Sequence, residues 1–505
     1  MRNDMRNVIF LLLCLGFIGC SDFLEESSQD QVRPSTVDDL MQVMVGEGYP
    51  MNYLQFAYIE LLTDDMQCNG AGGKETQVIH VEKMYPLFSW SDDIYENLTD
   101  ERYNTWQICY NKIMGCNTVL DYMDQVSGEE KMKNNMRGQA LVLRAYYYFL
   151  LVNYYGLPYN YGDPTKNPGV PLKLGMEVVD GFLPRESVAK VYERVIADLM
   201  EGIKLLEENK METSLYKISA LAGKAILCRV YLYMEDWDHV LEYANMVLGE
   251  KPDLASLASA PEDAMQYQGQ SQWCVYNESV SNEIIWKYGS MFEFSGCYNN
   301  GNGLATAPYT VSDELIALYD FSENSVNHFD LRRYMYFVYN AYMTFTPSSG
   351  IVMFPYHGCK GGKVNNRMPV RGIRTAELYL NRAEAYVRKF METGEDNYRT
   401  SALDDLNKLR ENRYDTRNVP YNKVDIAKAD ELLQFYQEER RRELCFEDHR
   451  WFDLRRYGMP ELKHMYFVEK NSIQELVLKK EDPRYVLPIP QSALERNPYL
   501  EQNKR

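Results

Sequence analysis

The chain has 505 residues and a formal net charge of −19 at pH 7, from 73 acidic and 54 basic side chains. This acidic balance disfavours nucleic acid and anionic lipid as partners, because both carry negative charge. Aromatic residues make up 13% of the chain, so part of them must lie on a surface or in a groove. The length is sufficient for a large core, which we expect to form two interleaved lobes rather than three separate domains.

The first residues have the layout of a signal peptide. Two arginines precede the apolar run 8–17, and Gly19 stands directly before Cys20. The run is too short for a membrane-spanning helix, which needs about twenty residues. We therefore predict a signal peptide over residues 1–19 and a lipid attached to Cys20. The alternative is an ordinary secretory signal followed by a coincidental cysteine, and either interpretation exports the protein.

The cysteines and histidines give no sign of a metal site. The ten cysteines are scattered singly, and none forms a Cys-x-x-Cys pair. Cys109, Cys116 and Cys228 fall within helical periodicity, where a thiol packs as a small apolar side chain, so we expect mostly buried free thiols. The six histidines show no His-Glu-x-x-His or similar ligand spacing. We expect no cofactor, and the sequence leaves open whether a structural calcium is bound.

Helical periodicity dominates the first half of the chain. Residues 137–155 carry apolar and aromatic side chains at helical spacing, and Gly156 with Pro158 ends that helix. A long loop is predicted over residues 156–182, where proline and glycine are frequent. A second long amphipathic helix is predicted to begin near Glu186.

Two helical hairpins are predicted from small residues at the helix crossings. In residues 218–248, Glu235 lies in the turn and Trp237 opens the second helix, which is the pattern of tetratricopeptide hairpins. A similar pair recurs at residues 375–389 and 401–412. Two such helix pairs suggest tetratricopeptide-like packing, but they do not make a repeat array.

Residues 252–372, between the hairpins, change to short runs bounded by glycine and asparagine. Residues 283–288 and 351–354 are examples. We expect loops with a few short strands in this region. Because binding residues concentrate in loops carried on a rigid frame, this is the first place to look for a site.

Residues 436–458 form the most specific stretch, a predicted helix dense in charge. Glu438 and Arg442 are four residues apart and can pair along one helical face. Taken alone, the pattern favours a solvated charged face. If the helix is buried, each charge needs a partner and the helix becomes a structural keystone.

The order of several segments resembles that of the SusD-like (RagB/SusD) family of outer-membrane nutrient-binding lipoproteins. The match spans nearly the whole chain. The segments that carry the resemblance are the Cys20 lipobox with Ser21 to Leu24, Trp106 to Leu120, Arg144 to Gly156, Pro184-Arg185, Ala222 to Ala225, Asp330 to Arg332, Arg374 to Glu384, Glu438 to Arg456, and Leu487 to Pro490 near Asn497-Pro498.

This resemblance implies a mostly α-helical fold with tetratricopeptide-like helix pairs, which support an irregular loop-rich region with a few short strands. It implies a SusC-like TonB-dependent barrel as partner, with the lipoprotein as its hinged lid and an oligosaccharide as ligand. It also implies anchoring to the outer membrane, and the acidic stretch after Cys20 favours display on the cell exterior. The implied divisions are a signal peptide (1–19), an N-terminal helical region (20–250), a loop-rich ligand-binding region (251–372) and a C-terminal helical region (373–505).

Loop aromatics are the candidates for a glycan site. Sugars present flat C–H faces and rims of hydroxyl groups, so a binding site stacks them on aromatic rings and hydrogen-bonds the rims. We assign Trp106, Trp237 and Trp451 to helix packing instead, and the alternative for Trp286 is a buried strand. The candidate ligand-binding residues are Trp90, Asp92, Tyr95, Trp273, Tyr276, Trp286, Tyr298 and Asn300.

Three functions remain open after the sequence is read. The first is a glycan-binding lipoprotein of a transport complex, the second is the same scaffold binding peptides, and the third is a surface glycoside hydrolase. A hydrolase needs two carboxylates at a fixed distance, and among this many acidic residues no pair stands out. The chain also lacks a Gly-x-Ser-x-Gly elbow and a complete P-loop. We therefore expect a binding protein without catalytic residues.

Overall fold

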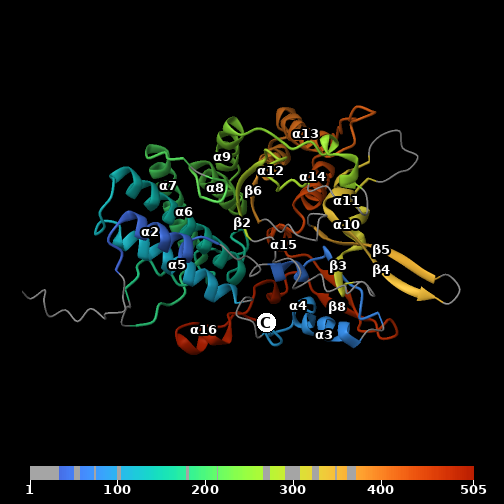
Figure 1. Cartoon of the computed structure of the whole chain (residues 1–505), viewed down its shortest axis with the longest axis horizontal. Helices are drawn as coiled ribbons and strands as arrows, with labels where there is room; N and C mark the ends of the chain where they lie inside the picture. Colours follow the sequence, from blue (N-terminus) through green and yellow to red (C-terminus); the bar gives the residue numbers. More distant parts are fainter. Residues whose placement is uncertain are drawn as a thin grey trace, which may run out of the picture.

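The fold was analysed in a computed structural model, and it is mostly α-helical, as predicted (Figure 1). The predicted signal peptide, Cys20, Tyr298 and Asn300 lie outside the described residues. The structure describes residues 33–50, 57–72, 75–98, 104–177, 181–212, 214–265, 273–289, 307–320, 329–346, 350–360 and 371–505.

A stack of helices forms the N-terminal part. It contains α2 (Val37–Val43), α5 (Thr105–Tyr122), α6 (Glu130–Tyr155) and α7 (Val188–Glu208), and α6 packs between α5 and α7. Both long helices predicted here are confirmed. A Cβ atom on Gly138 of α6 would lie 2.9 Å from the carbonyl oxygen of Gly202 on α7, so glycine permits this close approach.

Both predicted hairpins are confirmed. The first is α8 (Ala220–Met234) with α9 (Trp237–Glu250), and the second is α12 (Thr375–Thr393) with α13 (Asp396–Glu411). The turn of the first hairpin places Glu235 in the left-handed region, with φ of 60°. The two hairpins lie side by side because α9 packs on α12 (Figure 1). A buried ion pair of 2.6 Å between Arg229 and Glu377 joins them.

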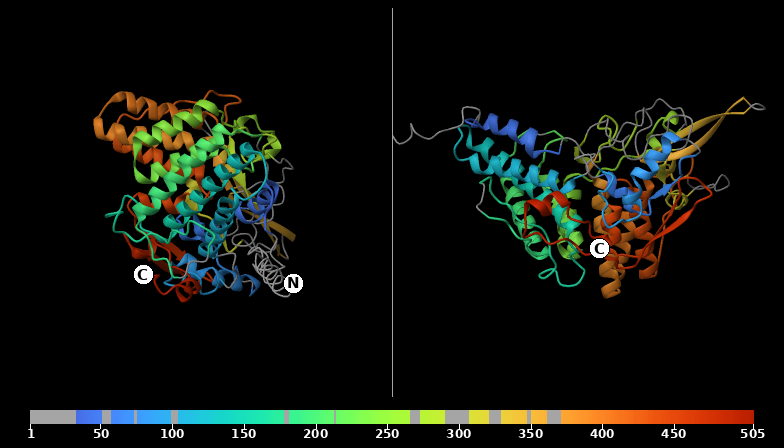
Figure 2. Two further views of the ribbon diagram at one scale, coloured as in Figure 1. Left: turned by 90° about the vertical axis from the view of Figure 1, so that its left-hand side faces the viewer. Right: turned by 90° about the horizontal axis from the view of Figure 1, so that it is seen from below.

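The described strands form four separate antiparallel pairs. They are β1 (Met66–Cys68) with β3 (Tyr309–Val311), β2 (Ile284–Tyr288) with β6 (Arg371–Arg374), β4 (Phe337–Thr346) with β5 (Gly350–Lys360), and β7 (Leu462–Tyr466) with β8 (Gln474–Leu478). The predicted strand at 351–354 is therefore part of a longer one. Its partner β4 was not predicted, and together they extend away from the helical body as a two-stranded ribbon (Figure 2).

Five further α-helices of the described residues are short and lie near the strands or at the C-terminal end of the chain (Figure 1). The large hydrophobic core includes residues from Val37 to Ile489, and a smaller one lies between α12, α13 and the helix that follows them. Six cysteines are buried free thiols, as expected, among the described residues. The short helices are α3 (Glu75–Lys83), α4 (Tyr85–Phe88), α10 (Asp313–Ala317), α11 (Arg332–Met335) and α16 (Gln491–Arg496).

The prediction of one continuous helix over residues 436–458 is wrong. The chain forms α14 (Ala429–Leu444) and α15 (Arg450–Arg456), separated by a sharp corner. Phe446 and Asp448 take left-handed backbone conformations there, with φ of 57° and 64°. Neither glycine nor proline marks this corner, so helical spacing continued through it in the sequence. The charged residues of α14 are largely buried, which excludes the solvated face.

Glu443 of α14 is the centre of a buried ion-pair cluster. Its side chain is fully buried, and so are the three arginines around it. Burial alone would raise the pKa of Glu443, but the three guanidinium charges hold it well below its ordinary value. The contacts to its carboxylate are Arg332 at 3.1 Å, Arg374 at 2.9 Å, Arg413 at 2.9 Å and the hydroxyl of Tyr336 at 2.8 Å.

Replacing Glu443 tests this cluster. We expect Glu443→Gln to lower the free energy of unfolding by about 3 to 5 kcal/mol, because it leaves buried guanidinium charges uncompensated. Glu438→Gln is the matched control on the same helix, since the Glu438 side chain is 38% exposed and its ion pair spans 3.8 Å. The control should cost less than about 1 kcal/mol. Equal losses in urea denaturation of the two variants would contradict a structural role for the cluster.

The lowered pKa values of two other buried carboxyls predict that the protein loses stability in acid. Burial raises the pKa of Glu384, but Arg456 and Arg388 lower it to about 2, and Arg374 with Lys360 likewise brings Glu447 to about 2. The unfolded value is 4.5, so this stabilisation is present above pH 4.5 and is lost as the pH falls to about 2. The raised pKa of Glu283 acts in the opposite direction.

Urea midpoints measured from pH 6 to pH 2 check this prediction. Glu384→Gln should lower the midpoint at pH 6 and flatten its dependence on pH below 4.5, because the titrating carboxyl is gone. A variant whose midpoint runs parallel to that of the native protein over this range would show that Glu384 does not carry the effect.

Candidate ligand-binding site

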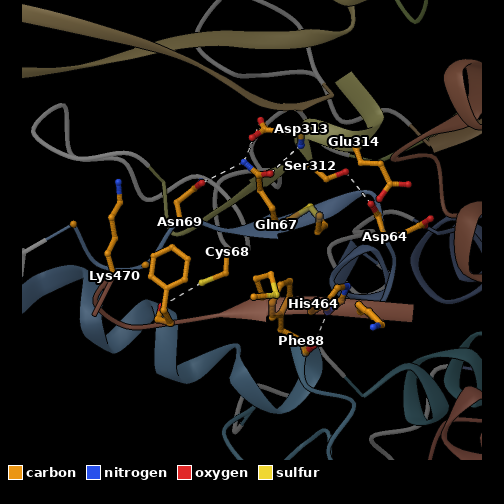
Figure 3. Close-up of a pocket in the computed structure, with 16 residues that line it drawn as sticks. Asp64, Gln67, Cys68, Asn69, Phe88, Ser312, Asp313, Glu314, His464 and Lys470 are labelled. Atoms are coloured by element: carbon orange, nitrogen blue, oxygen red, sulfur yellow. Dashed lines mark hydrogen bonds between the residues drawn. The ribbon is translucent and has the colours of Figure 1, made fainter. Parts of the chain in front are cut away.

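A cavity of about 590 Å³ opens between the β1–β3 pair and β7 (Figure 3). Its volume lies in the range of small-molecule binding sites. The strands bring together segments that are hundreds of residues apart in the chain. Its lining comprises Asp64, Met66, Gln67, Cys68, Asn69, Gly70, Gly72, Phe88, Ser312, Asp313, Glu314, Lys463, His464, Met465, Phe467 and Lys470.

Carboxamides and a carboxylate form one edge of this pocket (Figure 3). The Oε1 atom of Gln67 accepts a hydrogen bond of 2.8 Å from the backbone N–H of Asp313. The Nδ2 atom of Asn69 donates to the carbonyl of Ala307 at 3.0 Å and to the hydroxyl of Thr310 at 2.9 Å. Both amides are thus held in fixed orientations, while the side chain of Asp313 is exposed. Such an edge suits a ligand rich in hydroxyl groups.

Phe467 supplies a partly exposed aromatic ring beside this edge. Gly70, with φ of +70°, brings the turn after β1 against the ring, and a Cβ atom there would lie 2.6 Å from Phe467 Cε2. The N–H of Ala71 donates to the carbonyl of Val468 at 2.7 Å, which fixes the two loops together. Glycine at this position therefore decides where the ring of Phe467 sits.

The floor of the pocket is a stack of three rings. His464 lies between Phe88, at a centroid distance of 4.0 Å, and Trp90, at 4.2 Å. Its two ring nitrogens face the carbonyls of Phe88, at 2.7 Å, and Thr63, at 3.0 Å. Burial lowers the pKa of His464, and the two carbonyls oppose that shift. The stack is thus held from both sides and makes a rigid base.

The ion-pair network of α14 and α15 supports the back of the pocket. Arg450 and Arg441 contact Asp64 at 2.7 Å and 3.2 Å. Burial raises the pKa of Asp64, but these two charges outweigh it and bring the pKa below its ordinary value. The backbone carbonyl of Asp64 accepts a hydrogen bond of 2.8 Å from Ser312, whose hydroxyl also caps α10. The wall and the edge of the pocket are therefore connected.

The candidate residues before α5 do not line this pocket. Trp90 is 1% exposed, with φ of 52°, and its Nε1–H donates to the carbonyl of Leu62 at 2.9 Å. Its role in this structure is to pack against His464, beneath the cavity. Asp92 is exposed. Tyr95 is half-buried, with its hydroxyl 3.2 Å from that of Tyr155.

The other candidates lie elsewhere in the fold. Trp286 is fully buried in β2 and meets the ring of Tyr146 edge-on at 5.3 Å. This agrees with the alternative given for Trp286, a position in a buried strand. Tyr276 is 6% exposed, with the guanidinium of Arg374 at 5.1 Å from its ring centre. Trp273 is half-buried at the edge of the core. None of these three lines the pocket, and the ligand-binding role of the whole candidate set stays a prediction.

The three tryptophans assigned to helix packing lie in the core or against it, as expected. Trp106 and Trp451 are buried, and Trp237 is half-buried against the core. Trp106 meets Tyr155 edge-on at 5.0 Å, whereas Trp451 stacks on Tyr485 at 4.9 Å. These rings therefore join elements of the frame.

Sequence reasoning missed the pocket residues themselves. Gln67 and Asn69 precede the glycine-rich run that begins at Gly70, and neither is aromatic. Asp313 lies within the predicted loop-rich region, but the search there was for aromatic side chains, and Asp313 is not aromatic. The signal that could have found them is a polar turn next to a short strand, since loops at strand ends carry sites.

The described residues show neither a metal cluster nor a membrane-spanning helix. No group of three or more histidine, cysteine, aspartate or glutamate side chains in the described ranges is placed to hold a metal ion. Within the same ranges, no helix is both long enough and apolar enough to cross a bilayer.

Comparisons with known proteins agree with this architecture. "SusD-like protein P2" of Formosa agariphila is 24% identical over 550 residues, which cover 98% of both chains. A "SusD-like carbohydrate binding protein" from Bacteroides vulgatus superposes with a TM-score of 0.64 at 19% identity, covering 92% of this chain and 97% of the other. A SusD superfamily protein from Bacteroides thetaiotaomicron gives a TM-score of 0.66 at 21% identity, covering 93% and 100%.

Two family matches cover most of the chain. Residues 22–232 match the family described as "Starch-binding associating with outer membrane", and residues 351–505 match the "SusD family". The predicted motifs from Trp106 to Ala225 and from Arg374 to Pro498 fall inside these two matches. The chain therefore belongs to the SusD-like family.

Proposed function

We propose that this protein binds oligosaccharides at the outer membrane and passes them, as a lid, to a SusC-like TonB-dependent barrel. The observation that carries the proposal is the pocket between the β1–β3 pair and β7. It combines fixed carboxamides, an exposed carboxylate and an aromatic ring on a rigid floor. This is the set of groups that a sugar needs, because sugars pair apolar faces with hydroxyl rims.

In this proposal the groups of the pocket have separate tasks. The ring of Phe467 stacks on the C–H face of one sugar unit. The amides of Gln67 and Asn69, which contact each other at 3.4 Å, and the carboxylate of Asp313 hydrogen-bond the hydroxyl groups of the same unit through their remaining donor and acceptor positions. Trp90 does not contact the sugar in this proposal. It acts indirectly, by holding His464 in the floor of the pocket.

The loop candidates complete the proposed binding surface. Trp273, Tyr298 and Asn300 belong to the loop-rich region, and we propose that they contact further units of an oligosaccharide. Asp92 and Tyr95 would contribute from the segment before α5. The competing function is peptide binding by the same scaffold. Calorimetry with both classes of ligand separates peptide binding from glycan binding.

Single substitutions in the pocket test the binding proposal. Phe467→Ala should weaken a bound oligosaccharide about tenfold, since one aromatic stack contributes about 0.5 to 1.5 kcal/mol beyond the area it buries. Asn69→Ala should weaken it by a similar factor. Tyr499→Ala is the control, because Tyr499 is 64% exposed and does not line the pocket.

Calorimetry of the native protein and these variants gives the readout, with a glycan panel and a peptide library as ligands. Tight binding of peptides with no response to any glycan would assign the scaffold to peptides. Glycan affinity that is unchanged in Phe467→Ala and Asn69→Ala would place the site elsewhere, and loss in Trp273→Ala would then assign it to the loop candidates.

Membrane attachment and the barrel partner need a separate test. Affinity purification of the full-length protein from solubilised outer membrane should bring down a barrel in stoichiometric amount. Cys20→Ser should release the protein from the membrane fraction, because it removes the proposed lipid. A native protein that is purified alone, or a Cys20→Ser variant that stays in the membrane, would contradict this part of the proposal.

A further inference from the structure

The β4–β5 ribbon differs from the rest of the chain in its composition. Residues 338–359 contain no aspartate, glutamate, lysine or arginine, although these make up 25% of the chain. Edge strands are usually protected from pairing with other chains by charged side chains, and this ribbon has none of them. The stretch is also rich in aromatic residues, which are Tyr339, Tyr342, Phe345, Phe354 and Tyr356.

The ribbon is long and has no third strand in the described part of the chain. β4 has 10 residues and β5 has 11, so the ribbon is about 30 Å long at about 3.3 Å per residue. The two strands pair only with each other there, and they extend away from the helical body (Figure 2). A two-stranded ribbon is at best marginally stable by itself in water. A partner that covers one of its faces would therefore stabilise it.

The base of the ribbon is fixed in the core and adjoins the strands of the pocket. Phe337 of β4 and Lys360 of β5 are paired in register and buried. The ring of Phe337 meets that of Tyr319 edge-on at 5.6 Å. The Nζ atom of Lys360 donates to the carbonyl of Glu443 at 2.7 Å. β5 also packs against β3, whose partner β1 lines the pocket, so the ribbon lies next to this strand pair and extends beyond it (Figure 1).

The register divides the ribbon into two faces, because successive residues of a strand alternate between faces. One of them, the aromatic–hydroxyl face, combines aromatic, hydroxyl and amide residues, and Tyr342 is directly opposite Phe354 on it. The other face is mainly apolar, with Met343 opposite Met353. The aromatic–hydroxyl face comprises Asn340, Tyr342, Thr344 and Thr346 of β4 with Gly350, Val352, Phe354 and Tyr356 of β5.

We propose that the aromatic–hydroxyl face continues the glycan site, so that the protein takes long, uncharged glycan chains in preference to short ones. This role rests on the proposed function, because the pocket has to hold the first sugar units. Units farther along the same chain would lie on Tyr342, Phe354 and Tyr356. A neutral polymer with flat C–H faces and hydroxyl rims matches aromatic and hydroxyl groups on a face without charge. A second copy of this chain is the competing occupant.

The length of the glycan provides the test. Calorimetry compares disaccharides with long oligosaccharide fractions, both prepared from starch, cellulose, xylan and mannan. The native protein should bind the long fraction of its glycan about tenfold more tightly than the disaccharide, since two aromatic stacks are added. Tyr342→Ala combined with Phe354→Ala should remove this preference and leave the affinity for the disaccharide unchanged. The matched control is Met343→Ala with Met353→Ala, the next opposed pair on the other face, which should keep the preference.

The possible failures can be told apart. Equal affinity of the native protein for both lengths, or a preference that persists in the Tyr342→Ala and Phe354→Ala variant, would overturn the role of the ribbon and leave the proposed function standing. No binding at either length would overturn both. Equal loss in the methionine control would exclude a role for one particular face. A dimer in solution that the Tyr342→Ala and Phe354→Ala variant loses would assign the face to a second copy.

Hydrogen exchange of the native protein gives a readout that needs no variant. The long fraction should slow the exchange of backbone amides in β4 and β5, whereas the disaccharide should slow exchange only around the pocket. Slower exchange that stays confined to the pocket with both ligands would exclude a contact between the glycan and the ribbon.

Discussion

The matching of buried charges along α14 and α15 is the constraint on which the rest of the structure depends. Glu443 contacts arginines from α11, from β6 and from the segment just after α13, and Arg374 and Arg413 also reach Glu283 beside β2. A buried ion pair loses most of its compensation when either partner moves. The cluster therefore ties together α11, α14, the strand pair β2–β6 and the segment just after α13.

The same two helices connect this network to the proposed glycan pocket. Arg441 reaches both Asp64, in the pocket wall, and the buried Asp65, at 2.6 Å. Asp64 in turn holds the hydroxyl of Ser312, which starts α10 and thereby sets the position of the Asp313 carboxylate. Displacing α14 would thus move the binding edge, although no residue of α14 lines the cavity. A rigid frame of this kind favours binding, because the polar groups need no reordering when the ligand arrives.

Local patterns predicted the frame, whereas the site and the corner depended on long-range contacts. The helices and both hairpins follow from periodicity within a few turns, which the sequence displays directly. Trp90 stands in a polar stretch and so suggested exposure, but His464, far along the chain, covers its ring. The contact between Gln67 and Asp313 joins residues 246 positions apart, and no local pattern predicts such a pair. Phe446 likewise takes a left-handed backbone conformation just after α14. Because it is not a glycine, the sequence gives no local sign that the helix ends there.

Arg455 of α15 is 2% exposed and has no ion-pair partner among the described residues, and the geometry of the helix explains why. Asp453 is the acidic residue nearest in sequence, but residues two apart on a helix do not face each other. Both of its oxygens are also engaged, one by Arg440 at 2.8 Å and the other by Arg456 at 2.9 Å. The elements that close around Arg455 present phenol rings, a proline and a backbone carbonyl, none of which carries charge at pH 7. The charge of Arg455 is therefore stabilised by the backbone carbonyl of Gly156 and not by a carboxylate of the described residues.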